Sequence, residues 1–131
     1  MKIVVDTNVI VRTLVQDNPE QASIAQARLG ESKLIALPLT TLCETAWVLR
    51  KVYGFTSVAI LSALEAILTI RNIELNRPAV EAGLAVLRAG GDFADGVIAH
   101  EGWALGGDVF VSFDRKAVKL LHTQGYLTQL L

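Results

Sequence analysis

Short runs of β-branched and aliphatic residues alternate with helical segments along this chain, and this alternation constrains its fold more than any other feature. The runs at 3–5, 34–37, 73–75 and 109–111 have the length and composition of strands, and apolar residues at helical spacing separate them. Parallel strands need long crossovers, usually helices, so the alternation predicts an α/β fold around a mainly parallel sheet. We expect the strands at 3–5 and 109–111 to be buried on both faces, and a short last strand near 125–127.

Length and composition point to one folded domain. The chain has 131 residues, which predicts a single domain over 1–131, and 52% hydrophobic with 19% charged residues excludes a disordered chain. A net charge of −1 excludes a general basic surface for nucleic acid. The longest apolar stretch, 58–70, is too short to cross a bilayer, so we expect no membrane partner. One cysteine, Cys43, cannot form an internal disulfide, which fits a reducing cytoplasm.

Five carboxylates lie at positions that a parallel sheet would bring to one of its edges. Asp6 follows the first strand, Glu44 lies in the first turn of the helix after the second strand, and Asp114 follows the fourth strand. Asp92 and Asp95 lie at the start of the helix that follows Gly-Gly at 90–91. Carboxyl ends of parallel strands meet at one edge of the sheet, where ligands bind in open α/β folds. We therefore expect all five at one edge.

Each carboxylate also has a purely structural interpretation. An acid in a first helical turn offsets the helix dipole by about 0.3–1 kcal/mol, and Thr41 followed three residues later by Glu44 has the pattern of a capping box. Several carboxylates close together repel one another unless a cation lies among them. Oxygen-only ligands suit Mg²⁺ or Mn²⁺, and such an ion can activate water and stabilise charge on a phosphoryl group. The set therefore indicates a metal site for phosphoryl chemistry.

Four ordered segments of this chain resemble those of PIN domains, and more narrowly those of the VapC-type toxins of bacterial toxin–antitoxin pairs. The segments are Val-Val-Asp-Thr-Asn-Val-Ile (4–10), Thr-Leu-Cys-Glu-Thr-Ala-Trp-Val-Leu (41–49), Asp-Phe-Ala-Asp-Gly-Val-Ile-Ala (92–99) and Ser-Phe-Asp-Arg-Lys (112–116). The resemblance covers the whole chain in order and length. It implies a three-layer α/β/α sandwich and a metal-dependent endoribonuclease.

The resemblance also implies roles for single residues. The catalytic quartet maps onto Asp6, Glu44, Asp95 and Asp114, with Asp6 and Asp95 as Mg²⁺ or Mn²⁺ ligands. Asp114 would bind the metal directly or through water, and Glu44 would orient water. The residues expected to support the carboxylates by hydrogen bonds are Thr7, Asn8, Asp92 and Ser112.

Partners follow from the same reasoning. RNA would be the substrate, and basic residues beside the quartet are candidate phosphate contacts: Arg12, Arg115 and Lys116. The helix at 58–70 is apolar on nearly every side, which predicts a homodimer interface, a groove for a cognate antitoxin protein, or both. Packing in the core of the chain itself remains an alternative for this helix.

Other kinds of active site fit the sequence less well than that of a nuclease. Asn8 stands where a dehalogenase-type phosphatase needs a second aspartate, and no lysine ends the fourth strand as a receiver domain requires. Cys43 with His100 or His122 is a poor nucleophilic pair, because all three fall on predicted helices as structural or solvated side chains. A non-catalytic PIN-like module that binds RNA or protein stays open as the alternative to an enzyme.

Overall fold

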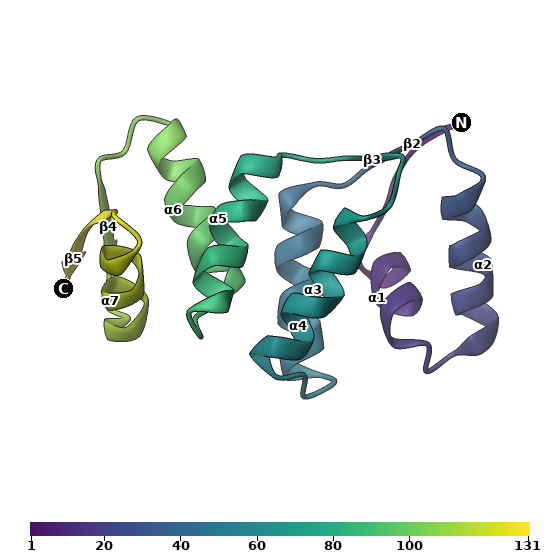
Figure 1. Ribbon diagram of the computed structural model, residues 1–131, viewed down its shortest axis with the longest axis horizontal. Helices are drawn as coiled ribbons and strands as arrows, with labels where there is room; N and C mark the ends of the chain where they lie inside the picture. The colour runs from purple at the N-terminus through teal and green to yellow at the C-terminus, as the bar shows by residue number, and fades with distance from the viewer. The chain divides into compact units, whose positions relative to one another are not determined.

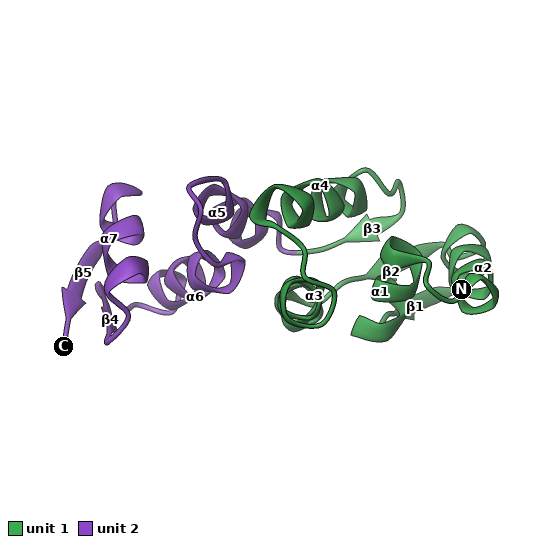
Figure 2. Ribbon diagram, turned by 90° about the horizontal axis from the view of Figure 1, so that it is seen from below, with its two compact units in different colours: residues 1–75 green, residues 76–131 purple.

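The computed structural model describes all 131 residues, and they form two compact units, residues 1–75 and 76–131, coloured separately in Figure 2. The elements of unit 1 are β1 (Lys2–Val4), α1 (Thr7–Val15), α2 (Pro19–Gly30), β2 (Leu34–Ala36), α3 (Leu39–Lys51), α4 (Ser57–Leu68) and β3 (Ile73–Glu74). Those of unit 2 are α5 (Arg77–Arg88), α6 (Phe93–Ala104), β4 (Val109–Ser112), α7 (Arg115–Thr123) and β5 (Leu127–Leu130), as Figure 1 shows. The expectation of one domain over 1–131 stays a prediction.

Unit 1 is built on a three-stranded parallel sheet in the order β1-β2-β3. Ile3 pairs with Ile35, and Ile35 pairs with Ile73, so one row of isoleucines crosses the sheet. Side chains at the helix starts satisfy free backbone N–H groups, since Asn18 accepts from Gln21 N and Thr56 from Ala59 N. Helices α1 and α2 pack together, as do α1 with α3 and α3 with α4.

Unit 2 pairs β4 with β5 in parallel and packs α7 against both strands. Val86, Ala99 and Leu121 form its buried cluster, against which Phe110 and Tyr126 pack. The start of each helix has a side-chain cap, from Asn76, Asp92 and Asp114 in turn.

Two glycines let α5 and α6 approach closely. A methyl group on Gly96 would meet the backbone of Ala82 and lie 2.7 Å from the Cα of Gly83, and one on Gly83 would lie 2.7 Å from the Phe93 ring. Glycine at these positions therefore serves packing, and it fixes the backbone next to Asp95. Figure 1 shows α5 and α6 side by side within unit 2.

The α/β class with parallel strands is confirmed, but two expectations about burial are wrong. Val4 is 73% exposed, and Val109 and Val111 are 47% and 49% exposed. These residues lie on β1 and β4, each an edge strand with one paired neighbour, so neither strand is buried on both faces. The apolar helix α4 buries only a stripe of Ile60, Leu64 and Ile67, at the spacing of one helix face.

No helix of the chain is both long and apolar enough to cross a membrane.

Candidate functional site

The first candidate group, here called the unit 1 acidic pair, consists of Asp6 and Glu44. Asp6 caps α1, and its Oδ1 accepts a hydrogen bond from the Thr7 backbone N–H at 2.7 Å. Both carboxylates are exposed, and both line a pocket of about 390 Å³ within unit 1. Arg12 and Tyr53 line the same pocket. The pair is therefore accessible to a ligand and has a cation beside it.

Glu44 lies in the second turn of α3, so its predicted place in the first turn is wrong. The helix begins at Leu39 with Pro38 as its N-cap, and no side chain caps it. Thr41 is buried and forms no capping box, because its hydroxyl donates to the carbonyl oxygen of Val5 at 3.2 Å. A buried carbonyl needs a donor, and this bond ties α3 to the end of β1 beside Asp6. The contact fixes the helix that carries Glu44 against the strand that precedes Asp6.

The hydroxyl of Thr7 is an unpartnered polar atom in this pocket. Thr7 is 6% exposed, and its Oγ1 has no hydrogen-bond partner. A buried hydroxyl without a protein partner is costly, and in native proteins such a group usually bonds to a water or an ion. It therefore adds a third oxygen donor to the two carboxylates that line the pocket with it.

The second candidate group, here called the unit 2 acidic trio, consists of Asp92, Asp95 and Asp114. Asp92 caps α6 by accepting from Ala94 N at 3.2 Å, and Asp114 caps α7 by accepting from Ala117 N at 3.1 Å. Asp95 lies in the first turn of α6. Burial, reinforced by the negative charges of Asp92 and Asp114, raises the pKa of Asp95 from 3.8 to about 6. The trio therefore concentrates negative charge at the starts of α6 and α7.

The residues expected to support the carboxylates take different places. Ser112 Oγ accepts from the backbone N–H of Asp114 at 2.9 Å, so it holds the main chain of that residue. Asn8 is exposed and lines the pocket of the unit 1 acidic pair. Asp92 is a helix cap, as its position after two glycines suggests. Their roles toward a bound metal stay predictions.

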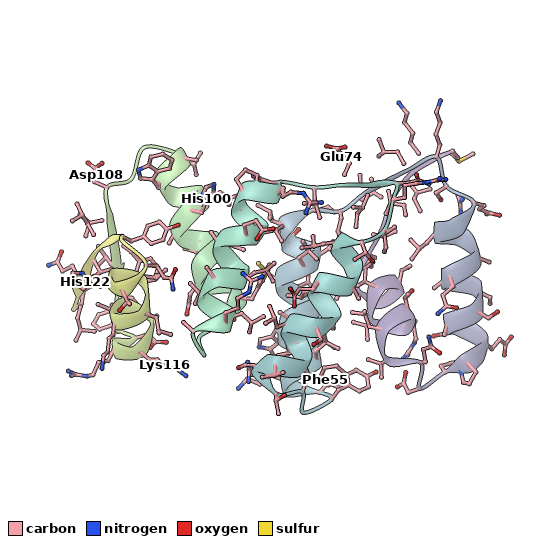
Figure 3. The ribbon with its side chains drawn as sticks, viewed as in Figure 1. Phe55, Glu74, His100, Asp108, Lys116 and His122 are labelled. Carbon is pink, nitrogen blue, oxygen red and sulfur yellow. The ribbon has the colours of Figure 1, made fainter.

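The candidate phosphate contacts also differ from one another. Arg115 and Lys116 are exposed in the first turn of α7, next to Asp114; Figure 3 labels Lys116 at that end of the helix and His122 at the other. Arg12 is half-buried and bonded to Asp17 and Gln21. These two partners and Tyr53 were not predicted from the sequence. Tyr53 lies 36 residues from Asp17, to which its hydroxyl donates a hydrogen bond. No local pattern carries that pairing.

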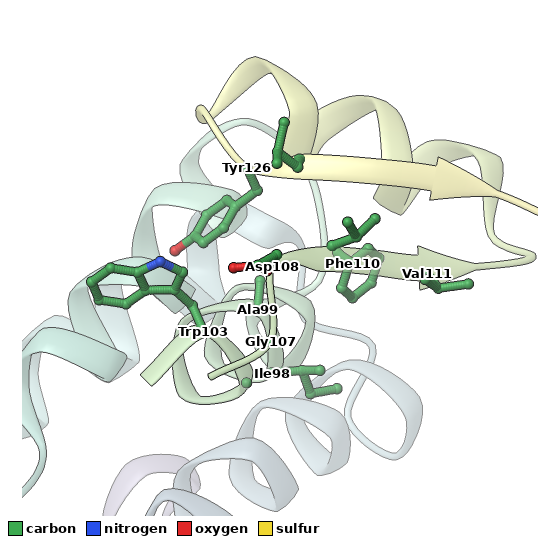
Figure 4. A pocket seen from close by; sticks show the side chains of 11 residues that line it. Ile98, Ala99, Trp103, Gly107, Asp108, Phe110, Val111 and Tyr126 are labelled. Carbon is green, nitrogen blue, oxygen red and sulfur yellow. The ribbon is translucent and has the colours of Figure 1, made fainter. Parts of the chain in front are cut away.

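A separate pocket of about 250 Å³ lies within unit 2 and holds none of the candidate residues. Figure 4 shows Trp103, Tyr126 and the Asp108 carboxylate gathered at one end of it, with Phe110 and Val111 further along β4. His100 is in ring contact with Trp103, with centroids 6.3 Å apart. The structural role expected for His100 agrees with this contact.

The donor chemistry of both groups fits a hard divalent cation. The available ligands are carboxylates and one hydroxyl, all oxygen, as Mg²⁺ and Mn²⁺ prefer. The trio contains an acid with a raised pKa, and a nearby cation would lower that pKa again. No three of these side chains stand together in metal-coordinating geometry.

Comparison with known families gives a match over nearly the whole chain. The PIN domain family matches residues 3–120, a range that contains all four carboxylates of the expected quartet. No curated protein matches the chain. PIN domains are typically metal-dependent nucleases with an α/β fold, and the parallel strands and seven helices seen here are consistent with their three-layer α/β/α architecture. The chain belongs to the PIN domain family.

Proposed function

We propose that this protein is an endoribonuclease that hydrolyses RNA phosphodiester bonds with Mg²⁺ or Mn²⁺ held by carboxylates. One observation carries the proposal: the PIN match over residues 3–120 spans all four carboxylates of the expected quartet, Asp6, Glu44, Asp95 and Asp114. Each of the four is accessible to solvent or half-buried, as a group that meets substrate must be. The raised pKa of Asp95 supports the proposal, because perturbed carboxylates cluster at functional sites.

Each residue has a separate task in this proposal. A bound Mg²⁺ or Mn²⁺ would supply an activated water and positive charge for the phosphoryl group. Asp6 and Asp95 would ligate the ion, and Asp114 would ligate it directly or through water. Glu44 would orient the attacking water with its carboxylate, and the Thr7 hydroxyl would hold a water or the ion next to Asp6. Exposed Arg115 and Lys116 would contact the RNA backbone.

The same proposal includes a biological setting. The protein would act as the toxin of a VapBC-type pair in the cytoplasm, as a homodimer inhibited by its antitoxin. The support is the excess of apolar surface on single elements, such as Val58 of α4, which is 74% exposed. An antitoxin would block the site by bringing a cationic side chain to the carboxylates.

A cleavage assay tests the enzymatic part. Purified protein is incubated with single-stranded RNA of mixed sequence in Mg²⁺, in Mn²⁺ and in EDTA. We expect cleavage only with the metals, and none from Asp6→Asn or Asp95→Asn. Asparagine keeps the size of both side chains, and at Asp6 it also keeps the helix cap. Asp108→Asn is the matched control, because Asp108 is exposed and has no hydrogen bond, and it should cleave as the wild type does.

Two outcomes would count against this proposal. Cleavage in EDTA would exclude the metal mechanism. RNA binding without cleavage in either metal would favour the non-catalytic binding module instead. The partner claims have their own test, since light scattering of a stable monomer at micromolar concentration would contradict the homodimer.

A further inference from the structure

A hydrogen-bonded network surrounds the guanidinium of Arg12, which lines the pocket of the unit 1 acidic pair. Arg12 Nε donates to Gln21 Oε1 at 2.6 Å, and Arg12 Nη1 donates to Asp17 Oδ1 at 3.0 Å and to Tyr53 Oη at 3.5 Å. Tyr53 Oη in turn donates to the second oxygen of Asp17 at 3.0 Å. Three partners on different segments therefore hold one cation.

The local chain path brings two of these partners to Arg12. Helix α1 ends at Gln16 in a left-handed conformation with φ of 59°, which costs a residue other than glycine about 1–2 kcal/mol. Asn18 then caps α2 by accepting from the backbone of Gln21. This corner turns Asp17 and Gln21 back toward the α1 residue Arg12. Tyr53, the third partner, lies in the turn after α3.

The network does more to orient Arg12 than to stabilise the fold. The side chains of Arg12 and Asp17 are 33% and 44% exposed, and an ion pair this exposed contributes about 0–1 kcal/mol. A guanidinium held at two of its nitrogens, however, has already lost most of its rotamer freedom, so a ligand does not have to order it. Its third nitrogen, Nη2, has no partner in the protein. The guanidinium of Arg12 is therefore held in one orientation, and its Nη2 remains free to bind a ligand.

The chemistry of that nitrogen identifies its ligand. Nη2 offers two N–H donors and a share of the delocalised positive charge, which the ion pair with Asp17 only partly offsets, and these match the oxygens of a phosphate. The pocket also holds Asp6 and Glu44, which would repel a phosphate that had no fixed cation to meet it.

We infer that Asp17, Gln21 and Tyr53 are positioning residues that fix Arg12 to receive one phosphate of an RNA strand beside Asp6 and Glu44. This inference rests on the proposed function, and it extends it by assigning a task to three side chains outside the quartet. Arg12 touches the substrate; the other three act through it.

The first test measures binding without chemistry. A labelled, mixed-sequence single-stranded RNA is titrated in EDTA at several salt concentrations, and the slope of log K against log salt concentration is determined. Arg12→Gln should reduce the magnitude of that slope by about 0.7, the value for one phosphate contact on a single strand. Arg71→Gln is the matched control, because Arg71 is exposed and has no hydrogen bond, and it should leave the slope unchanged.

The second test separates positioning from charge. Tyr53→Phe and Gln21→Ala leave every charge of the protein in place, so the salt slope should not change. RNA binding should weaken about threefold, and kcat should fall about tenfold with a smaller change in KM, because a displaced phosphate matters most in the transition state. Tyr126→Phe, which removes a hydroxyl without a hydrogen bond, should change none of these values. Thermal melts of each variant verify that it is folded at the assay temperature.

The outcomes distinguish this inference from the proposed function. An unchanged slope in Arg12→Gln, or wild-type binding and kcat in both Tyr53→Phe and Gln21→Ala, would overturn the inference while RNA cleavage persists. The expected slope and affinity changes in a protein that binds RNA but cleaves none would support the inference and contradict the proposed reaction. A wild-type protein that binds no RNA would overturn both.

Discussion

The two acidic groups of this protein differ in what surrounds them. The unit 1 acidic pair shares its pocket with the guanidinium of Arg12 and the unpartnered hydroxyl of Thr7. The unit 2 acidic trio lies at helix N-termini with the exposed cations Arg115 and Lys116 next to Asp114, and the pKa of Asp95 still rises to about 6 through burial and the charges of its two acidic neighbours. The first group thus has a guanidinium and a hydroxyl in its pocket, whereas the like charges around Asp95 repel one another and a bound cation would offset that repulsion.

The two groups also differ in how the fold holds them. A hydrogen bond from Thr41 to Val5 fixes the helix that carries Glu44. Close backbone packing at Gly96 fixes the residue next to Asp95. A long-range hydrogen bond fixes the helix of Glu44, whereas close backbone packing at Gly96 adds to the helix caps of Asp92 and Asp114 in the trio, so different substitutions should loosen each.

The largest expected effect is on catalysis. It distinguishes a carboxylate that binds the metal from one that orients water. Asp95→Asn removes a proposed metal ligand and should lower kcat/KM in Mn²⁺ by more than about 100-fold. Glu44→Gln should lower it by about 10–100-fold, the range for groups that act one step away from a metal. Steady-state kinetics on one RNA substrate provides both values. The reverse order would mean that Glu44, and not Asp95, acts as the metal ligand of the two.

The next largest effect is on the free energy of unfolding, and it tests the packing of α6 against α5 beside Asp95. Gly96→Ala should lower the free energy of unfolding by about 1–3 kcal/mol, because the added methyl group meets the backbone of Ala82 and Gly83. Gly102→Ala lies on the same helix with nothing within 4 Å, and it should raise stability by up to about 1 kcal/mol. Urea denaturation measures both. Equal effects from the two alanines would show that the close approach at Gly96 is not what requires glycine there.

A smaller effect tests the hydrogen bond that holds unit 1. Thr41→Val keeps the shape of the side chain but leaves the Val5 carbonyl without its donor, which should destabilise the protein by about 1–2 kcal/mol. Thr40→Val is the control, because Thr40 is exposed and has no hydrogen bond. If both variants unfold at the same urea concentration, the bond to Val5 contributes nothing measurable.

The smallest effect is the pH dependence of stability in EDTA. An acid whose pKa is higher in the folded state destabilises the fold once pH exceeds its unfolded value of 3.8, and fully above about 6. Asp95→Asn should therefore be more stable than the wild type at pH 7, by about 1 kcal/mol after allowance for partial exposure to solvent. The advantage should vanish near pH 4. An advantage that is constant across pH would exclude repulsion at Asp95 as its cause.

Local patterns predicted most of the fold. Apolar runs located the strands, and N-cap residues such as Asp92, followed by Phe93 and Asp95, located the helix starts to within one or two residues. The start of α3 was misplaced because Thr41 bonds to Val5, a partner 36 residues earlier that no local rule can include. Burial was overestimated at Val4 and Val111, since a strand's own residues do not reveal whether it lies at an edge.

The candidate site also contains residues that could be identified from the sequence and residues that could not. Asp6 and Asp114 were identifiable because each directly follows an apolar strand. The partners of Arg12 were not, because Asp17 and Gln21 look like ordinary polar residues of a helix–helix turn and Tyr53 is distant in sequence. The backbone atoms of α5 that lie against Gly96 were likewise not predicted from the sequence.

The measurement that most directly tests the central claim is the thermal stability of four proteins with and without Mn²⁺. The four are the wild type, Asp6→Asn, Asp95→Asn and the double variant. If both acidic groups contribute to binding the same cation, Mn²⁺ raises the Tm of the wild type, by an amount equivalent to about 2.7 kcal/mol at 100 times Kd. That rise is lost in each single variant, and the double variant behaves like the singles because the interaction is already gone. A full Mn²⁺-dependent rise in either Asp6→Asn or Asp95→Asn would contradict the account.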